Sequence, residues 1–102
     1  MQLMQVARHT PETCPDYNEK YRKATVDWME NAPKIAEKYG VKIVGIWNDH
    51  ADHTTYLVYD VPNMESFMGF AMDPLTMPMY SFQNISVRPV FGPQEMIQML
   101  KR

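Results

Sequence analysis

Little in this sequence points to a secreted, membrane-bound or nucleotide-binding protein. A single cysteine cannot form an internal disulfide, which favours a reducing compartment, the cytoplasm. The four glycines are isolated from one another, so the sequence has no glycine-rich phosphate-binding loop. No apolar run approaches the ~20 residues that a membrane span needs. Residues 1–10 also lack the charged start and apolar run of a signal peptide.

An excess of charge of one sign is lacking too. Ten Lys and Arg residues against twelve Asp and Glu residues leave a net charge of −2, and no basic patch alternates with aromatic residues as nucleic-acid binding requires. With 102 residues, 45% of them hydrophobic, the chain is expected to form one domain, residues 1–102. The ten methionines suit irregular gaps in a core or, as the alternative, provide soft ligands for copper.

Hydrophobic periodicity predicts the order β-α-β-β-α-β, followed by a short C-terminal helix. We expect Asp16 to cap the first helix, Gly40 to end it, and Pro33 to kink or divide it near Asn31. Pro89 lies in the last strand and favours a sheet edge for that strand. Strands are predicted at 2–9, 41–48, 54–61 and 84–91, helices at 17–39, 64–72 and 93–102, and an irregular connection at 75–83.

This order is typical of a ferredoxin-like α+β fold, whose antiparallel four-stranded sheet has the strand order 4-1-3-2. Two helices can cover one face of such a sheet, yet large apolar side chains alternate onto both faces of its second and third strands. We therefore expect a homodimer whose sheets pack face to face; the alternative is that the C-terminal helix folds back over the open face. The opposing sets are Ile43 and Trp47 against Val44 and Ile46 in the second strand, and Leu57, Tyr59 and Val61 against Tyr56 and Val58 in the third.

Three stretches carry a resemblance to known proteins: "HTPETCP" after the first predicted strand, "YGVKIVGIW" in the middle, and "HTTYLVYD" at the start of the third strand. Over residues 2–91 the chain resembles a small uncharacterised family of bacterial and archaeal proteins, which is itself similar to the dimeric α/β-barrel superfamily. That superfamily includes quinol-type monooxygenases, muconolactone isomerases and haem-containing chlorite dismutases. The resemblance implies the fold and the dimer, but no single activity, because one fold hosts many chemistries.

All three histidines and the only cysteine lie in two short stretches, "RHTPETCPDY" and "NDHADHTTY". In the order 4-1-3-2 the end of the first strand lies beside the start of the antiparallel third, so His9 and His53 belong to the same end of the sheet. Cys14, His50 and the connection 73–83 reach that end too, which predicts one neighbourhood. His50 and the acidic residues beside it suit an exposed turn. Cys14 is expected to be either a small buried hydrophobe or a reactive thiolate near a helix N-terminus.

The first functional hypothesis is a small-molecule cavity between two packed sheets, which holds an aromatic or otherwise apolar compound. His9 or His53 would act as general acid/base, and Arg88 would hold an anionic oxygen. A cofactor-free oxygenase or isomerase fits the superfamily, and a binding module without turnover fits the same cavity. The sequence identifies no cofactor. The other residues expected at the cavity are Gln5, Trp47, Ser86 and either Tyr56 or Tyr59.

The second hypothesis is a metal site. Two imidazoles and a thiolate from His9, His53 and Cys14 suit zinc or copper, and a thioether from Met77 or Met79 would favour copper. The spacing of His9 and Cys14 is no recognised ligand motif. The third hypothesis is a dimeric regulatory module without chemistry of its own, in which these residues are structural.

Overall fold

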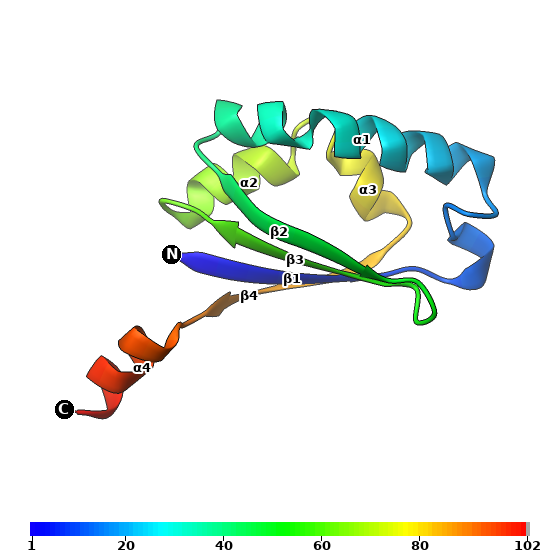
Figure 1. The fold of residues 1–102 in the computed structure, drawn as a ribbon. Helices are drawn as coiled ribbons and strands as arrows, with labels where there is room; N and C mark the ends of the chain where they lie inside the picture. Colours follow the sequence, from blue (N-terminus) through cyan, green and yellow to red (C-terminus); the bar gives the residue numbers. More distant parts are fainter. Residues whose placement is uncertain (102) are drawn as a thin grey trace.

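The computed structural model describes residues 1–101, which form an antiparallel sheet with helices packed on one of its faces (Figure 1). The strands lie in the order β2-β3-β1-β4, and every neighbouring pair is antiparallel. This is the predicted ferredoxin-like α+β arrangement, and β4 lies at the edge, as its proline indicated. The elements are β1 (Gln2–Arg8), η1 (Pro11–Thr13), α1 (Glu19–Lys38), β2 (Lys42–Asp49), β3 (Thr54–Asp60), α2 (Met64–Ala71), α3 (Met77–Ser81), β4 (Asn84–Val90) and α4 (Pro93–Leu100).

Helix α1 begins later than the sequence pattern predicted. Its N-cap is Asn18, whose side-chain oxygen accepts a hydrogen bond from the backbone N–H of Tyr21; the prediction of Asp16 was wrong. Pro33 lies inside α1 without dividing it. The helix ends as predicted at Gly40, whose φ of +71° is accessible to glycine because it lacks a Cβ. None of the helices in residues 1–101 combines the length and the apolar character that crossing a bilayer requires.

The core lies between the sheet and the helices α1 and α2. Leu3 of β1 and Tyr59 of β3 are completely buried on the covered face. The ring of Tyr59 meets that of Phe70 from α2 with their centroids 5.5 Å apart. Simple alternation along β1 and β3 places these side chains on one face, as the sequence predicted for both strands.

Strand β2 departs from simple alternation. Its pairing with β3 shifts register between Ile43 and Gly45, so Val44 is an extra residue, as in a β-bulge. Ile43 and Ile46 consequently both pack against the core, whereas Trp47, predicted to share the face of Ile43, lies on the opposite face and is 57% exposed. The indole lies across Gly45, where an added Cβ would come within 2.3 Å of the ring.

The connection 75–83, predicted to be irregular, contains the short helix α3. A proline in its first turn costs no helical hydrogen bond there. Asp73 holds the chain before it: the buried carboxylate accepts hydrogen bonds from the backbone N–H of Leu75 and the hydroxyl of Tyr39, both at 3.0 Å. The hydrogen bond from Leu75, followed by that from Tyr39, holds the pKa of Asp73 below its ordinary value although burial acts in the opposite direction.

Helix α4 extends from the end of β4 away from the rest of the chain (Figure 1). The longest dimension of the described structure, α4 included, is 52 Å. It does not fold back across the sheet, so the alternative considered from the sequence is wrong. Within residues 1–101, the face of the sheet opposite α1 and α2 has no covering helix.

We predict that Asp73→Asn lowers the free energy of unfolding at pH 7 by about 1–2 kcal/mol, since it removes charge-assisted hydrogen bonds. The folded-state pKa of Asp73 is lowered, so its stabilisation is present above the unfolded value of about 3.9 and is lost as the pH falls through the folded value. Urea unfolding of both proteins at a series of pH values measures this. A difference between wild type and variant that stays constant into strong acid would contradict the assignment.

Candidate functional site

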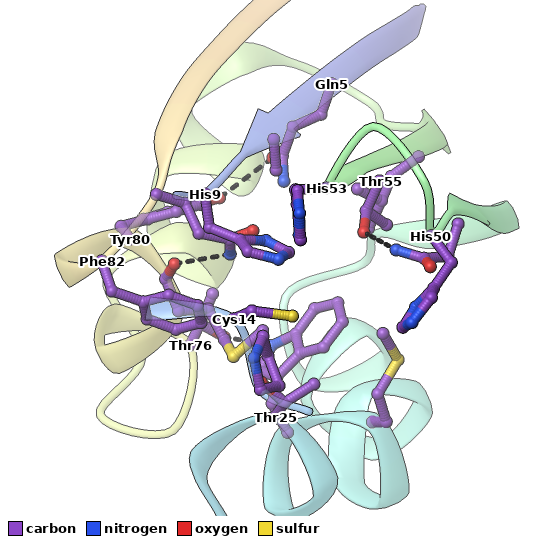
Figure 2. Close-up of a pocket in the computed structure, with 18 of the residues that line it drawn as sticks. Gln5, His9, Cys14, Thr25, His50, His53, Thr55, Thr76, Tyr80 and Phe82 are labelled. Atoms are coloured by element: carbon purple, nitrogen blue, oxygen red, sulfur yellow. Dashed lines mark hydrogen bonds between the residues drawn. The ribbon is translucent and has the colours of Figure 1, made fainter. Parts of the chain in front are cut away.

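A cavity of about 220 Å³ lies between the covered face of the sheet and the helices α1 and α3. Gln5 of β1 and Leu57 of β3 line it from the sheet, Trp28 from α1, and Met79 from α3. Figure 2 shows the side chains that line it. This cavity lies on the covered face of the sheet, whereas the sequence hypothesis placed a cavity on the face where two sheets would pack.

His9 and His53 meet at one end of this cavity (Figure 2). The backbone N–H of His9 donates to the carbonyl oxygen of His53 at 3.1 Å, and the rings stand edge to face with centroids 5.2 Å apart. His53 has a φ of +51°, in the left-handed region that histidine adopts more readily than most residues. His9 Nε2 and His53 Nδ1 are buried, and neither has a hydrogen-bond partner among residues 1–101. Buried polar atoms without partners are rare in native proteins.

The environment of His9 favours its neutral form. Burial lowers the pKa of His9, and the neighbouring His53 lowers it further. A hydrogen bond with the Gln83 side chain raises the pKa and offsets part of this effect. At pH 7 the His9 imidazole is therefore neutral and can accept a proton or bind a metal ion.

Cys14 reaches the same place from the segment between η1 and α1. Its carbonyl oxygen accepts hydrogen bonds from the backbone N–H groups of Tyr17 (2.9 Å) and Asn18 (2.8 Å), a turn that delays the start of α1. Cys14 is 3% exposed, which agrees with the buried one of the two sequence alternatives, and it lines the cavity. Its sulfur and one ring nitrogen each of His9 and His53 all lie within 4.8 Å of one another.

Gln5 is a further buried polar group on the cavity wall. Its Oε1 accepts hydrogen bonds from the hydroxyl groups of Tyr80 (3.2 Å) and Tyr59 (3.5 Å). Burial raises the pKa of Tyr80 to about 12, and it raises the pKa of Tyr59 as well, so both hydroxyls remain donors at neutral pH. Tyr80 belongs to α3, the helix that sequence periodicity did not predict, and for that reason it was absent from the predicted site.

The β2–β3 hairpin forms part of the cavity mouth. His50 Nε2 lies 2.6 Å from Asp16 Oδ2, and this contact links the hairpin to the segment before α1. Asp49 accepts a hydrogen bond from the backbone N–H of Asp52, whose carboxylate in turn accepts one from Arg8. The two acidic residues of the hairpin therefore serve the turn, as the sequence predicted.

Several predicted cavity residues lie on the other face of the sheet. Val6 of β1 pairs with Tyr56 of β3 and Ser86 of β4, whereas Gln5, which lines the cavity, has the opposite parity. The antiparallel register pairs even-numbered positions of β1 with even-numbered positions of β4, so Arg88 also points away from the cavity and cannot hold a ligand there. The residues that this correction moves to the open face are Trp47, Tyr56, Ser86 and Arg88.

The helix side of the cavity was missed by the sequence analysis as a ligand surface. Trp28 lies in a stripe of apolar residues at steps of three and four along the first helix, a pattern that is typical of a core-facing helix side. Its indole N–H donates to the hydroxyl of Thr76 at 3.1 Å, and both residues line the cavity. The stripe was the available signal, since the side of a helix that faces the sheet also faces any cavity between them.

Comparison with known proteins identifies the fold. No protein-family model matches the sequence, and no curated protein matches it. An uncharacterised NIPSNAP domain protein from Burkholderia xenovorans superposes with a TM-score of 0.53 and 11% identity, covering 91% of this chain and 97% of that one. An antibiotic biosynthesis monooxygenase superposes with a TM-score of 0.54 and 10% identity, covering 90% of this chain and all of that one. Similarity at this level confirms the ferredoxin-like fold and transfers no residue roles.

We predict that Gln5→Leu lowers the free energy of unfolding by about 2–4 kcal/mol, because two buried tyrosine hydroxyls lose their acceptor. Urea unfolding measures the loss. The double variant Gln5→Leu, Tyr80→Phe should recover part of it, since one of the stranded donors is then removed. Additive effects of the two substitutions would show that the Gln5–Tyr80 contact contributes nothing.

Proposed function

We propose that this protein binds a small aromatic compound in the cavity between its sheet and its helices, and acts on that compound as a cofactor-free oxygenase or isomerase. We also propose that it does so as a homodimer in the cytoplasm, where a single free thiol is common. The observation that carries the proposal is an apolar cavity with two buried, partnerless imidazole nitrogens at one end. Apolar walls with a few convergent polar groups are typical of ligand sites.

The size of the cavity limits the ligand. A cavity of about 150 Å³ lined by apolar side chains holds benzene, and pockets for drug-sized ligands begin at about 300 Å³. The value of about 220 Å³ lies between these limits and suits a compound of one or two rings. Trp28 and Phe82 offer ring faces and edges to such a compound.

The polar end of the cavity supplies the chemistry. An imidazole nitrogen of His9 or His53 accepts the hydrogen bond of a phenolic or enolic hydroxyl and can take its proton as general base. The resulting anion, held among apolar walls, is the reactive species for oxygenation by dioxygen and for isomerisation alike. One solved structure of the same fold is an antibiotic biosynthesis monooxygenase, which supports oxygenation as the first activity to test.

Naphthol should bind the metal-free protein with saturation at one molecule per chain, measured by calorimetry in the presence of a chelator. His53→Asn should weaken binding by about tenfold, the contribution of one hydrogen bond, while asparagine tolerates the left-handed backbone at this position. Arg88→Gln, on the opposite face, should leave the affinity unchanged.

Absence of saturable binding would contradict the ligand cavity. To test for turnover, the protein is incubated in air with a panel of phenols and enols, and products are sought by mass spectrometry. Binding without any product would indicate a binding or regulatory module and would overturn the enzymatic part of the proposal.

The open face of the sheet supports the dimer. Trp47 is 57% exposed there, an unusual position for an indole in a monomeric protein. Helix α4 leaves this face uncovered in residues 1–101 (Figure 1). A second copy of the sheet would bury the same apolar surface on both partners at once. The other large apolar side chains of this face are Met4, Val6, Tyr56 and Val58.

Sedimentation velocity at low micromolar concentration should give a particle of twice the 12.0 kDa chain mass. Trp47→Glu should shift it to the monomer, because a charge would be buried in the interface. Val26→Glu is the matched control, since Val26 is 47% exposed on α1, on the other side of the molecule. A 12.0 kDa particle for the wild-type protein would refute the dimer.

A further inference from the structure

We infer that His9, Cys14 and His53 form a site for one zinc or copper ion at the end of the cavity where the two histidines meet. The three side chains come from the end of β1, the segment after η1 and the start of β3, and they converge on one point (Figure 2). Each offers one ligand atom, and the three atoms all lie within 4.8 Å of one another. Two imidazoles and a thiolate are a donor set that both metals accept.

The observed spacing is close to that of a bound ion. Tetrahedral zinc with Zn–N of about 2.0–2.1 Å and Zn–S of about 2.3 Å places its ligand atoms about 3.3–3.6 Å apart. The three atoms therefore need to approach by at most about 1.2–1.5 Å, a movement on the scale of side-chain rotations.

The histidine nitrogens are available for an ion. His9 Nε2 and His53 Nδ1 are buried without a partner among the described residues, although each such atom costs about 1–3 kcal/mol when it is left unpaired. The rings do not satisfy each other, since they meet edge to face without a hydrogen bond between them. A metal ion would use the lone pair that neither the other histidine nor the backbone uses.

The backbone holds each ligand in place independently. The His9 N–H donates to the His53 carbonyl oxygen, and His53 keeps a left-handed conformation, which directs its ring inward. The carbonyl oxygen of Cys14 accepts hydrogen bonds from two N–H groups of the turn that follows it, and these bonds fix the position of Cys14. His53 therefore has a strained backbone conformation beside two other potential ligands, and such strain is found mainly at functional sites.

The surroundings complete the site. The Gln83 side chain contacts His9, and its Nε2 donates to the Met79 carbonyl oxygen at 2.7 Å, so its amide oxygen remains to orient the imidazole. Met79 is 8% exposed and lines the same cavity, where a weak thioether ligand would favour copper. Met77 is 51% exposed and does not line the cavity, so of the two methionines considered from the sequence only Met79 is placed for this role.

An open coordination position on such an ion would face the cavity, because all three ligands line it. The site is then of the catalytic kind, with three protein ligands and one exchangeable position. An ion bound here would occupy the imidazole nitrogens that the cofactor-free proposal uses as general base, so the two proposals make competing use of the same atoms and are tested separately.

The test uses untagged protein stripped with a chelator and titrated anaerobically with Co²⁺, a spectroscopic substitute for zinc. We expect one equivalent to bind with a thiolate-to-cobalt charge-transfer band that Zn²⁺ then abolishes. Cys14→Ser should remove the band and weaken binding by at least about a hundredfold, and His53→Asn should weaken it comparably, because each substitution removes one of only three protein ligands.

The matched control is His50→Asn, which removes the other histidine of the same hairpin and should leave the band and the affinity unchanged. Circular dichroism and thermal melting of the metal-free variants establish that they fold. Absence of the band in folded wild-type protein, or an equal effect of His50→Asn and His53→Asn, would overturn the inference and indicate adventitious binding to surface histidines.

The variant Met79→Leu distinguishes a copper site from a zinc site. If copper is the physiological ion, the variant binds copper more weakly and changes the visible copper–thiolate absorption, while Zn²⁺ affinity is retained. If zinc is the ion, native protein purified without a tag contains zinc and the variant retains it. Native protein with less than about a tenth of an equivalent of either metal, together with weak binding in the titration, would refute both forms. Naphthol binding is measured with a chelator present, so either proposal can fail alone.

Discussion

The pairing of β1 with β3 is the contact on which the rest of the site depends. Its last backbone hydrogen bond, from His9 to the His53 carbonyl, joins residues 44 positions apart in the sequence and brings two imidazoles edge to face. His53 ends the hairpin with a φ of +51°, and its side chain lies on the covered side, where it lines the cavity. Cys14 then meets both rings, since the turn after η1 returns the chain over the same end of the sheet.

The one-sided covering of the sheet divides the molecule into two kinds of surface. On the covered face, helices and strands enclose a cavity together with buried polar groups, of which Gln5 is satisfied by two tyrosines and the histidine nitrogens are not. On the open face lie apolar side chains, with Trp47 folded across Gly45. The cavity therefore does not use the apolar side chains of the open face.

The candidate site was predictable only where topology alone places residues. Strand order brought His9, Cys14 and His53 to one end of the sheet, since the end of one strand must lie beside the start of its antiparallel neighbour. The side of the sheet was harder to predict. Ser86 and Arg88 were assigned to the wrong face because their parity depends on the register with β1, and a register is a property of two strands. Trp47 was misplaced by the bulge at Val44, which arises from pairing with β3.

By itself the sequence determined the order of the four strands and the three longer helices, the edge position of β4 and the end of the sheet at which the histidines and the cysteine gather, because these follow from local periodicity, proline chemistry and chain connectivity. Only the tertiary structure decided which face each strand turns toward the helices, that a cavity lies on the covered face, and that His9 Nε2 and His53 Nδ1 have no partner among residues 1–101. Those features depend on register and on contacts between segments far apart in the chain, and no single segment encodes them.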